Sequence, residues 1–450
     1  MKKLMFSVGF ATVSALSMGA GFGIYEASSR GNAMGGAIVG DSFNTDATMN
    51  YYNPANISFA EKVQLAAGVT FINPYCDVDV EHKSQDRMNP GWFTVPTFYA
   101  TIPLPLDFTF GFGTYTEYGL GTKYAYNWAL AGDTKKTTMR QVTLNPNLAY
   151  KVTSKWSVAA GLRFSWIQFQ NRKSPYAGET RYQDYSVGPY SGTLSATDAY
   201  HLSSKLKGDD WGMGWIAATS YQLNEDISFG LVYRSQVKHK IKGRFTMDGT
   251  VSGQMNGVLS AQGLPLPDQA VSSSFSQSQY EHKRASAKLR LPRSITGGVN
   301  WNVTPKYRVG ASLTWTEWSS IKNIDFNIPG RSYRLPLKWS DVWRFGIGME
   351  YDLLPWMCVR GGYTYDMDPS SKHHGSTMIP AGDRHIIGSG LGFEITENLW
   401  LDLGYSFIRM NNDDRFITLS NPQTGEKKQY KFATHNGFSH LVSATIRYSF

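Results

Sequence analysis

Apolar residues at every second position constrain the fold of this chain more than any other feature. Along residues 399–407 every odd position is apolar, and Asp402, Gly404 and Ser406 lie between them. The same alternation recurs along residues 156–166 and 307–315. Successive side chains of a strand point to opposite faces, whereas a helix brings apolar residues together every three or four positions. The pattern therefore predicts strands with one apolar and one polar face.

The N-terminus has the organisation of a secretory signal peptide. Lys2 and Lys3 form a positive start, an apolar run covers residues 4–16, and a small-x-small cleavage site ends at Gly19. We expect residues 1–19 to be removed. No later stretch reaches the roughly 18 to 20 continuous apolar residues that a spanning helix needs. If the exported protein enters a membrane, it must therefore cross as strands.

Composition fits a chain that interleaves apolar and polar surface. Aromatic residues make up 14%, charged residues only 18%, and the mean hydropathy is −0.33. The net charge of +9 comes from Lys and Arg spread along the sequence without a basic block, which gives little support to nucleic-acid binding. Cys76 and Cys358 lie far apart, and neither sits beside a second Cys or a His at ligand spacing. We therefore expect no metal site and no cofactor.

These features together predict an all-β fold, a transmembrane antiparallel β-barrel. Only helices and closed barrels satisfy all backbone hydrogen-bonding groups inside lipid. Many alternating runs cover ten or more residues, while strands of a soluble sandwich average about 5 to 6. Short polar or proline-containing breaks between the runs are expected on the periplasmic side, and longer polar connections outside. We predict about 14 strands, at residues 63–72, 93–103, 107–116, 139–152, 155–170, 209–222, 226–244, 281–302, 306–326, 334–352, 356–367, 384–395, 399–411 and 437–450.

The C-terminus carries the same alternation to the last residue. Val442, Ala444, Ile446, Tyr448 and Phe450 share one parity. A barrel strand that ends on an aromatic residue is typical of the signal that outer-membrane assembly machinery reads. We therefore expect Phe450 to contact that machinery, and the protein to lie in the bacterial outer membrane.

Residues 20–60 lack the alternation and are rich in Gly, Ser, Asn and Ala. Irregular backbone at membrane depth is tolerated only where protein or water surrounds it. The segment is therefore expected either to form a periplasmic tail or to fill the lumen of the barrel formed by residues 61–450.

Several segments resemble, in the same order, those of the FadL-type long-chain fatty acid transporters, a family that includes the TodX-type aromatic-hydrocarbon channels. The resemblance covers essentially the whole mature chain. Its motifs are Ala20-Gly21-Phe22, Asn53-Pro54-Ala55, Tyr118-Gly119-Leu120-Gly121-Thr122, Trp211-Gly212-Met213-Gly214-Trp215, Gly263-Leu264-Pro265-Leu266-Pro267, Trp315-Thr316-Glu317-Trp318-Ser319, Trp339-Ser340-Asp341-Val342-Trp343-Arg344 and Ile379-Pro380-Ala381-Gly382-Asp383-Arg384. In the last two motifs, Asp341 with Arg344 and Asp383 with Arg384 are read as ion pairs that hold strand register.

The resemblance implies a 14-stranded barrel plugged by an N-terminal hatch that contains Phe22, Asn53, Pro54 and Ala55. It also implies a lateral exit beside the third strand, where Phe110, Gly111 and Gly113 lie. Glycine in a strand often marks a bulge or a close approach of backbone. These glycines are therefore expected to form the exit, to make room for the hatch, or both.

Substrate capture is expected outside the membrane. The resemblance assigns an extracellular groove to loops 171–208 and 245–280. The second loop contains apolar residues that a solvated loop would not need, and they are expected to bind substrate: Leu259, Leu264, Leu266 and Val271. Arg172 and Lys322 are candidate partners for a fatty-acid carboxylate. Asp325 lies near the position of a basic pocket residue in the family, which favours a neutral hydrocarbon.

Other classes of function remain as alternatives. A general porin would need an open lumen, and the segment 20–60 argues against one. An enzyme is not expected, because no Gly-x-Ser-x-Gly motif is present and the histidines lack a catalytic setting. A surface adhesin is the remaining alternative. The expected function is uptake of long-chain fatty acids or other hydrophobic compounds by a monomer that contacts outer-membrane lipids and lipopolysaccharide.

Overall fold

The computed structural model describes residues 21–81, 85–88, 91–125, 128–174, 180–187, 190–256, 272–328, 331–420 and 427–450. The expected signal peptide, residues 1–19, lies outside this part of the chain. So do the four apolar residues expected in the capture groove, Leu259, Leu264, Leu266 and Val271.

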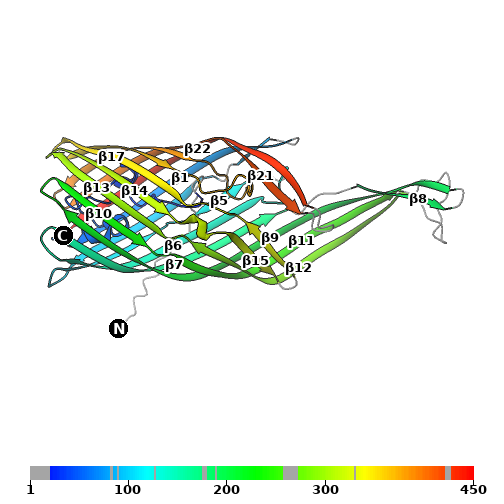
Figure 1. Ribbon diagram of the computed structural model, residues 1–450, viewed down its shortest axis with the longest axis horizontal. Coiled ribbons are helices and arrows are strands. Elements are labelled where there is room, and N and C mark those ends of the chain that lie inside the picture. Colours follow the sequence, from blue (N-terminus) through cyan, green and yellow to red (C-terminus); the bar gives the residue numbers. More distant parts are fainter. Residues whose placement is uncertain are drawn as a thin grey trace.

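One antiparallel sheet closes on itself to form a barrel (Figure 1). The last strand pairs with the first, from Gln64 opposite Ser449 to Val80 opposite Phe432, so the described sheet has no free edge at this seam. The described residues supply 14 positions around the wall, which confirms the predicted barrel. No helix in the same residues has the length and apolar character to span a membrane.

The strands follow one another around the wall in chain order, each hydrogen-bonded to the next. They are β1 (Gln64–Val80), β3 (Phe93–Pro103), β4 (Phe108–Tyr115), β6 (Lys136–Lys151), β7 (Trp156–Lys173), β9 (Tyr190–Gln222), β10 (Ile227–Arg234) with β11 (Val237–Asn256), β12 (Ser272–Leu291) with β13 (Ser294–Thr304), β14 (Tyr307–Thr316), β17 (Val342–Leu354), β18 (Met357–Asp366), β19 (Arg384–Thr396), β20 (Leu399–Met410) and β22 (Lys427–Ser449). Shorter strands extend or cover the wall: β2 (Gln85–Met88), β5 (Leu120–Lys123), β8 (Thr180–Val187), β15 (Asn323–Ile328), β16 (Arg331–Pro336) and β21 (Asp413–Ser420).

The two faces of the wall differ in the way the alternation predicts. On β9 the outward residues Trp211, Met213 and Trp215 are 58%, 64% and 49% exposed, although they are large and apolar. On β7 the inward residues Arg163 and Ser165 are buried. Apolar side chains outside and polar ones inside are the arrangement of a barrel whose outer face meets lipid.

Several strands continue further outward than the sequence analysis predicts. Most of residues 190–208 belong to β9, and β11 pairs with β12 without a register shift from Val237 opposite Leu291 to Asn256 opposite Ser272. Much of the two predicted loops, 171–208 and 245–280, is therefore paired β-structure that projects from one end of the barrel toward β8 (Figure 1). The alternation continues into the extension of β9, where Leu194, Leu202 and Leu206 share one parity, so the prediction of loops there is wrong.

Residues 21–60 lie inside the barrel, where Figure 1 shows their short helices in dark blue. These helices are α1 (Ser29–Ala33), α2 (Met49–Tyr52) and η1 (Pro54–Phe59). Inward glycines let the segment touch the wall: a Cβ atom at Gly310 would lie 2.0 Å from the carbonyl oxygen of Ala37, and one at Gly230 would lie 2.2 Å from that of Val39. Any larger residue at these two positions would push the segment away from the wall.

A chain of buried ion pairs ties this segment to one side of the wall. Glu350 of β17 accepts hydrogen bonds from Arg30 of α1 (Nε–Oε2 3.1 Å), from Arg308 (Nε–Oε1 2.9 Å) and from Arg360 (Nε–Oε2 2.5 Å). Asp402 of β20 continues the chain by accepting from Arg360 at 2.6 Å. The remaining links are Asp402 with Arg447, Arg447 with Asp46, and Arg30 with Asp41. Because each charge has a buried partner of opposite sign, the cost of their desolvation is offset.

Candidate functional site

An apolar cluster fills part of a lumen that is otherwise polar. Its members come from distant strands and from the N-terminal segment, and nearly all are fully buried. They include Phe22, Tyr118, Leu120, Met139, Ile167, Phe169, Val237, Ile241, Leu289, Leu291, Trp318, Ile321, Ile324, Phe326, Leu335, Leu337, Trp339, Val342, Met378 and Ile379. Apolar and aromatic side chains of this kind line most sites for hydrophobic ligands.

Phe22 lies among the aromatic side chains of the apolar cluster. Its ring centroid is 5.0 Å from that of Trp318, 5.5 Å from that of Trp339 and 5.8 Å from that of Tyr118. Phe22 and Trp318 are nearly perpendicular, with an interplanar angle of 85°. Such edge-to-face pairs add about 0.5–1.5 kcal/mol to the burial of the rings. The N-terminal segment therefore contributes directly to the cluster.

Local turns bring the two cluster tryptophans together. After β14 ends at Thr316, the 3-10 helix η2 (Trp318–Ser320) places Trp318 inside the barrel with 0% exposure. The turn is held by Asp341, whose Oδ1 accepts a hydrogen bond from the Ser319 amide at 3.0 Å. The expected Asp341–Arg344 ion pair is therefore absent from the described contacts. Asp341 precedes β17 and binds the turn at Ser319, whereas Arg344 of β17 faces the lumen.

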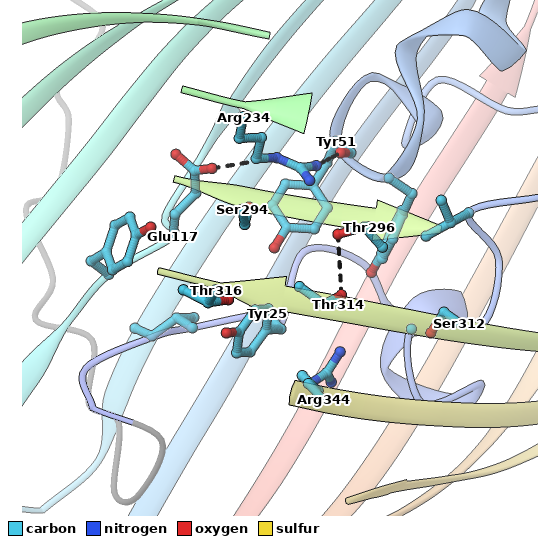
Figure 2. Close-up of a pocket in the computed structure, with 15 residues that line it drawn as sticks. Tyr25, Tyr51, Glu117, Arg234, Ser294, Thr296, Ser312, Thr314, Thr316 and Arg344 are labelled. Carbon is cyan, nitrogen blue, oxygen red and sulfur yellow. Dashed lines mark hydrogen bonds and ion pairs between the residues drawn. The ribbon is translucent and has the colours of Figure 1, made fainter. Parts of the chain in front are cut away.

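A polar chamber of about 60 Å³ adjoins the cluster, with which it shares Tyr118 (Figure 2). Tyr25 and Tyr51 of the N-terminal segment face it, together with hydroxyl side chains of β13 and β14. Arg234 and Arg344 supply its cationic groups and Glu117 its carboxylate. The full lining is Ile24, Tyr25, Gly36, Val39, Tyr51, Tyr52, Glu117, Tyr118, Arg234, Ser294, Thr296, Ser312, Thr314, Thr316 and Arg344.

The wall is interrupted beside these two regions. β4 ends at Tyr115, and the chain then turns inward, where Tyr118 forms a β-bridge with Gly23. The Ile24 amide donates to the Glu117 carbonyl at 2.8 Å. Among the described residues, Phe93–Thr97 of β3 therefore pair with β1 but have no partner on β4.

Gly111 and Gly113 of β4 face inward, and Phe110 faces outward. A Cβ atom at Gly111 would lie 1.9 Å from Oδ1 of Asn50 and 2.5 Å from Cδ1 of Ile57. One at Gly113 would meet the rings of Tyr99 and Tyr115 at 3.1 and 3.2 Å. A side chain at position 111 would therefore collide with residues 21–60, so their packing against β4 requires a glycine there.

The Asn53-Pro54-Ala55 motif connects the N-terminal segment to the wall. The Asn53 side chain accepts from the Ala55 amide at 3.0 Å, which caps η1, and Pro54 is the first residue of that helix. The Asn53 amide group donates to the carbonyls of Val39 (3.0 Å) and Thr219 of β9 (3.2 Å). A proline at the first helical position loses no hydrogen bond, since that N–H has no partner in a helix.

The two cations expected to bind a carboxylate are not part of either region. Arg172 is exposed near the outer end of β7, where it lies opposite Lys136 and Lys205. Lys322 is also exposed, although its neighbour Ile321 belongs to the apolar cluster. Two of the motif tryptophans, Trp318 and Trp339, and Arg344 lie at the lumen instead. In the sequence, these residues stood out only as members of the motifs shared with the family, and nothing there indicated that they face the lumen.

Known proteins resemble this chain over almost all of its length. It is 28% identical over 424 residues to the long-chain fatty acid transport protein of Escherichia coli O6:H1, covering 90% of each chain. It is 25% identical over 449 residues to outer membrane protein P1 of Haemophilus influenzae, with 91% of each covered.

Solved structures share the fold. A FadL homologue from Pseudomonas aeruginosa superposes with a TM-score of 0.75 at 19% identity, covering 96% of this chain and 100% of the other. The toluene transporter TodX of P. putida gives 0.65 at 16% identity, covering 94% and 98%. A model of one outer-membrane family, described as outer membrane protein transport protein (OMPP1/FadL/TodX), matches residues 10–450. This match confirms the predicted family and the predicted outer-membrane location. The chain belongs to the OMPP1/FadL/TodX family of outer membrane transport proteins.

Proposed function

We propose that this protein carries hydrophobic molecules, long-chain fatty acids or aromatic hydrocarbons, through the outer membrane. The observation that carries the proposal is the buried apolar cluster inside a polar lumen. Relatives are named for transport of both substrate classes. A water-filled porin would not help a poorly soluble substrate, whereas each methylene buried in an apolar pocket contributes about 0.8 kcal/mol to binding.

In this proposal residues 20–60 act as the hatch. Phe22 occupies the apolar cluster, and Asn53, Pro54 and Ala55 hold the segment against β9. Since the segment fills the lumen between strands on all sides, a substrate would leave sideways. The interruption after β4 is the favoured place, which gives Phe110, Gly111 and Gly113 their proposed role at the exit.

Capture is proposed to begin at the projecting strands and loops, residues 171–208 and 245–280. Leu259, Leu264, Leu266 and Val271 would supply apolar contacts there, with Arg172 and Lys322 as cations near the entrance. Binding by these six residues stays a prediction.

The proposal is tested by identifying molecules trapped in the purified barrel. The protein is extracted in detergent, washed, denatured and analysed by mass spectrometry. Fatty acids or aromatic hydrocarbons, depleted in an Ile167→Glu variant that places a charge in the apolar cluster, would support it. Ile167 is 0% exposed and belongs to the cluster. Equal amounts in both proteins would contradict it.

We also propose a contact with lipopolysaccharide, because basic residues lie in rows on the outer face. Lys123, Lys136, Arg172 and Lys205 are directly opposite one another across β5, β6, β7 and β9. A second row runs through Lys207, Arg244 and Arg284. Opposite residues of antiparallel strands share a face, so each row forms one cationic strip.

These rows lie outward of the membrane interface, at the level where the phosphates of lipopolysaccharide are expected. Trp211 and Trp166 are opposite one another and exposed or half-buried on the outer face, as in an interfacial aromatic girdle. Lys207 lies about 13 Å further outward along β9, at about 3.3 Å per residue. A groove of about 230 Å³ beside the first row is lined by Lys136, Arg140 and Arg172.

Native mass spectrometry with added lipid A tests this contact. Lys207→Glu combined with Arg244→Glu is expected to reduce binding of phosphorylated lipid A, while dephosphorylated lipid A binds weakly to both proteins. Unchanged binding by the variant would contradict the contact.

Phe450 is proposed to be the residue that assembly machinery reads. It follows β22, the strand that closes the barrel, and its amide donates to the Val63 carbonyl at 2.9 Å. We further propose that the protein works as a monomer, since one chain forms the whole wall. We also propose that it is not an enzyme.

A further inference from the structure

Residues 367–383 connect β18 to β19, and part of this connection crosses the lumen. β18 and β6 are seven positions apart in the wall of 14 positions, so they lie on opposite sides of the barrel. Nevertheless, Thr377 of the connection contacts Asp133, which lies three residues before β6. The Tyr124 hydroxyl, on the same far side, donates to the Thr377 carbonyl at 2.8 Å. The connection therefore reaches from one side of the wall to the other.

Both ends of the connection are fixed to the near side, at β21 and β22. The buried Arg415 side chain of β21 donates to the Asp368 carboxylate, and the Gly375 amide donates to a β21 carbonyl at 2.9 Å. Beyond the crossing, the Ala381 carbonyl accepts from a β22 hydroxyl at 3.3 Å. β21 lies toward the end of the barrel that carries the projecting strands (Figure 1). The crossing residues are therefore 376–380, at the outer end of the lumen.

Asp133 holds the crossing residues against the far side. Its Oδ2 atom accepts three hydrogen bonds, from the Thr377 amide at 3.0 Å, the Thr377 hydroxyl at 2.7 Å and the Ser376 hydroxyl at 3.1 Å. Asp133 is itself buried, and the nearby Ala131 carbonyl accepts from the Ser174 amide, just beyond β7, at 2.8 Å. Hydrogen bonds to an ionised acceptor are stronger than neutral ones. Three charge-assisted contacts across the lumen thus depend on one side chain.

The crossing residues cover the apolar cluster on its outer side. Met378 and Ile379 belong to the cluster and are buried in it. The Met378 sulfur lies 3.8 Å from the amide nitrogen of Asn171, which is two residues outward of the cluster member Phe169 on β7. Phe22 of the N-terminal segment packs into the same cluster. The cluster is therefore covered from outside by residues 376–380 and contacted by the N-terminal segment from within the barrel.

We propose that residues 376–380 form a lid over the apolar cluster, which Asp133 holds closed and which opens when a ligand enters or leaves. This rests on the proposed transport function and adds the step that controls access to its site. Opening breaks the hydrogen bonds to Asp133, while the contacts of Asp368, Gly375 and Ala381 keep the connection on the near side. Because hydrogen bonds alone join the lid to Asp133, it can open and close without any covalent change.

Stopped-flow binding of cis-parinarate, a fluorescent long-chain acid, to the purified full-length protein tests the lid. Asp133→Ala is expected to raise the association and dissociation rates together by about tenfold, as loss of a charged hydrogen bond lowers the barrier to opening. The Kd should stay the same, because the lid covers the cluster before and after binding. Asp133→Asn, which keeps the shape but not the charge, should raise both rates less. The matched control is Asp414→Ala, an aspartate of β21 that is 59% exposed.

A covalent link between the lid and the far side gives the converse test. In a background without the two native cysteines, Asp133→Cys and Thr377→Cys are joined by a short bis-thiosulfonate reagent, whose disulfides can be reduced afterwards. The linked protein should neither bind nor release cis-parinarate, and reduction should restore both rates. The control link joins Lys372→Cys to Asp413→Cys, whose native side chains lie 3.8 Å apart on the near side. This link should leave both rates unchanged, because it does not cross the lumen.

The outcomes distinguish the lid from the transport function itself. Ligand exchange at the wild-type rate in the protein linked between positions 133 and 377 would overturn the lid alone. A higher Kd with an unchanged association rate in Asp133→Ala would also overturn it, because Asp133 would then only stabilise the packing of the cluster. Failure of the wild-type protein to bind either cis-parinarate or pyrene, a neutral aromatic probe, would overturn the proposed transport function as well.

Discussion

Replacement of Glu350 by Gln should loosen the N-terminal segment from the wall. Glu350 is 2% exposed and, within the described part of the chain, is the one carboxylate that joins Arg30 of the segment to Arg308 and Arg360 of the wall. The amide keeps the shape of the side chain but removes its charge. Three arginines then lose their shared negative partner, while Asp41 remains beside Arg30.

The size of this effect follows from burial. Loss of one partner of a buried ion pair costs about 3–5 kcal/mol. Asp41 retains part of the attraction on Arg30, so we take the lower value of about 3 kcal/mol for holding the segment. At about 1.4 kcal/mol per factor of ten, the population with a displaced segment should rise about 100-fold.

Ion conductance of single barrels in a planar bilayer measures this population, because a displaced segment opens the lumen to water. Glu350→Gln should open about 100 times more often than the wild-type protein. Asp352→Asn is the control, since Asp352 is 35% exposed and pairs only with Arg308 among the described residues. Equal conductance in wild type and Glu350→Gln, or equal increases in both variants, would refute the reasoning.

Three further outcomes are expected. Trp318→Ala should weaken binding of a hydrophobic ligand about tenfold in an equilibrium binding assay, because it removes a buried ring from the apolar cluster; unchanged affinity would place the pocket elsewhere. Gly111→Val should reduce substrate uptake into vesicles with a folded barrel, since the new side chain meets Asn50 and Ile57, whereas Gly297→Val, with open space around its Cβ position, should not. Cys76 and Cys358 are both buried, so neither should react with a membrane-impermeant maleimide before denaturation; rapid labelling of the folded protein would argue against their burial.

The barrel could be predicted from sequence because a strand with one face toward lipid and one toward the lumen alternates apolar and polar residues. β20 runs over Leu399–Met410 where residues 399–411 were predicted, and β18 over Met357–Asp366 where 356–367 were predicted. The signal continues beyond the predicted ends of β9 and β11, where one parity stays mostly apolar. The outer parts of β9, β11 and β12 are predicted as loops because of their many polar residues, and that prediction is wrong.

The interior could be predicted only in outline. The absence of alternation in residues 20–60 indicated a segment apart from the wall, but not its partners. Its attachment through Arg30 and Glu350 joins residues 320 positions apart, which no local pattern reveals. The Arg344 side chain was read as an ion-pair partner of Asp341, because a motif shows neighbours in sequence and not the face to which each points.

Transport selectivity in vesicles with a lipopolysaccharide outer leaflet tests the central claim most directly. Labelled oleate and a small sugar are supplied together, and entry of each is compared between vesicles with and without the protein. A barrel with a filled lumen and an apolar pocket should speed the entry of oleate and leave the sugar outside. Rapid entry of the sugar, or oleate entry no faster than without the protein, would contradict the account.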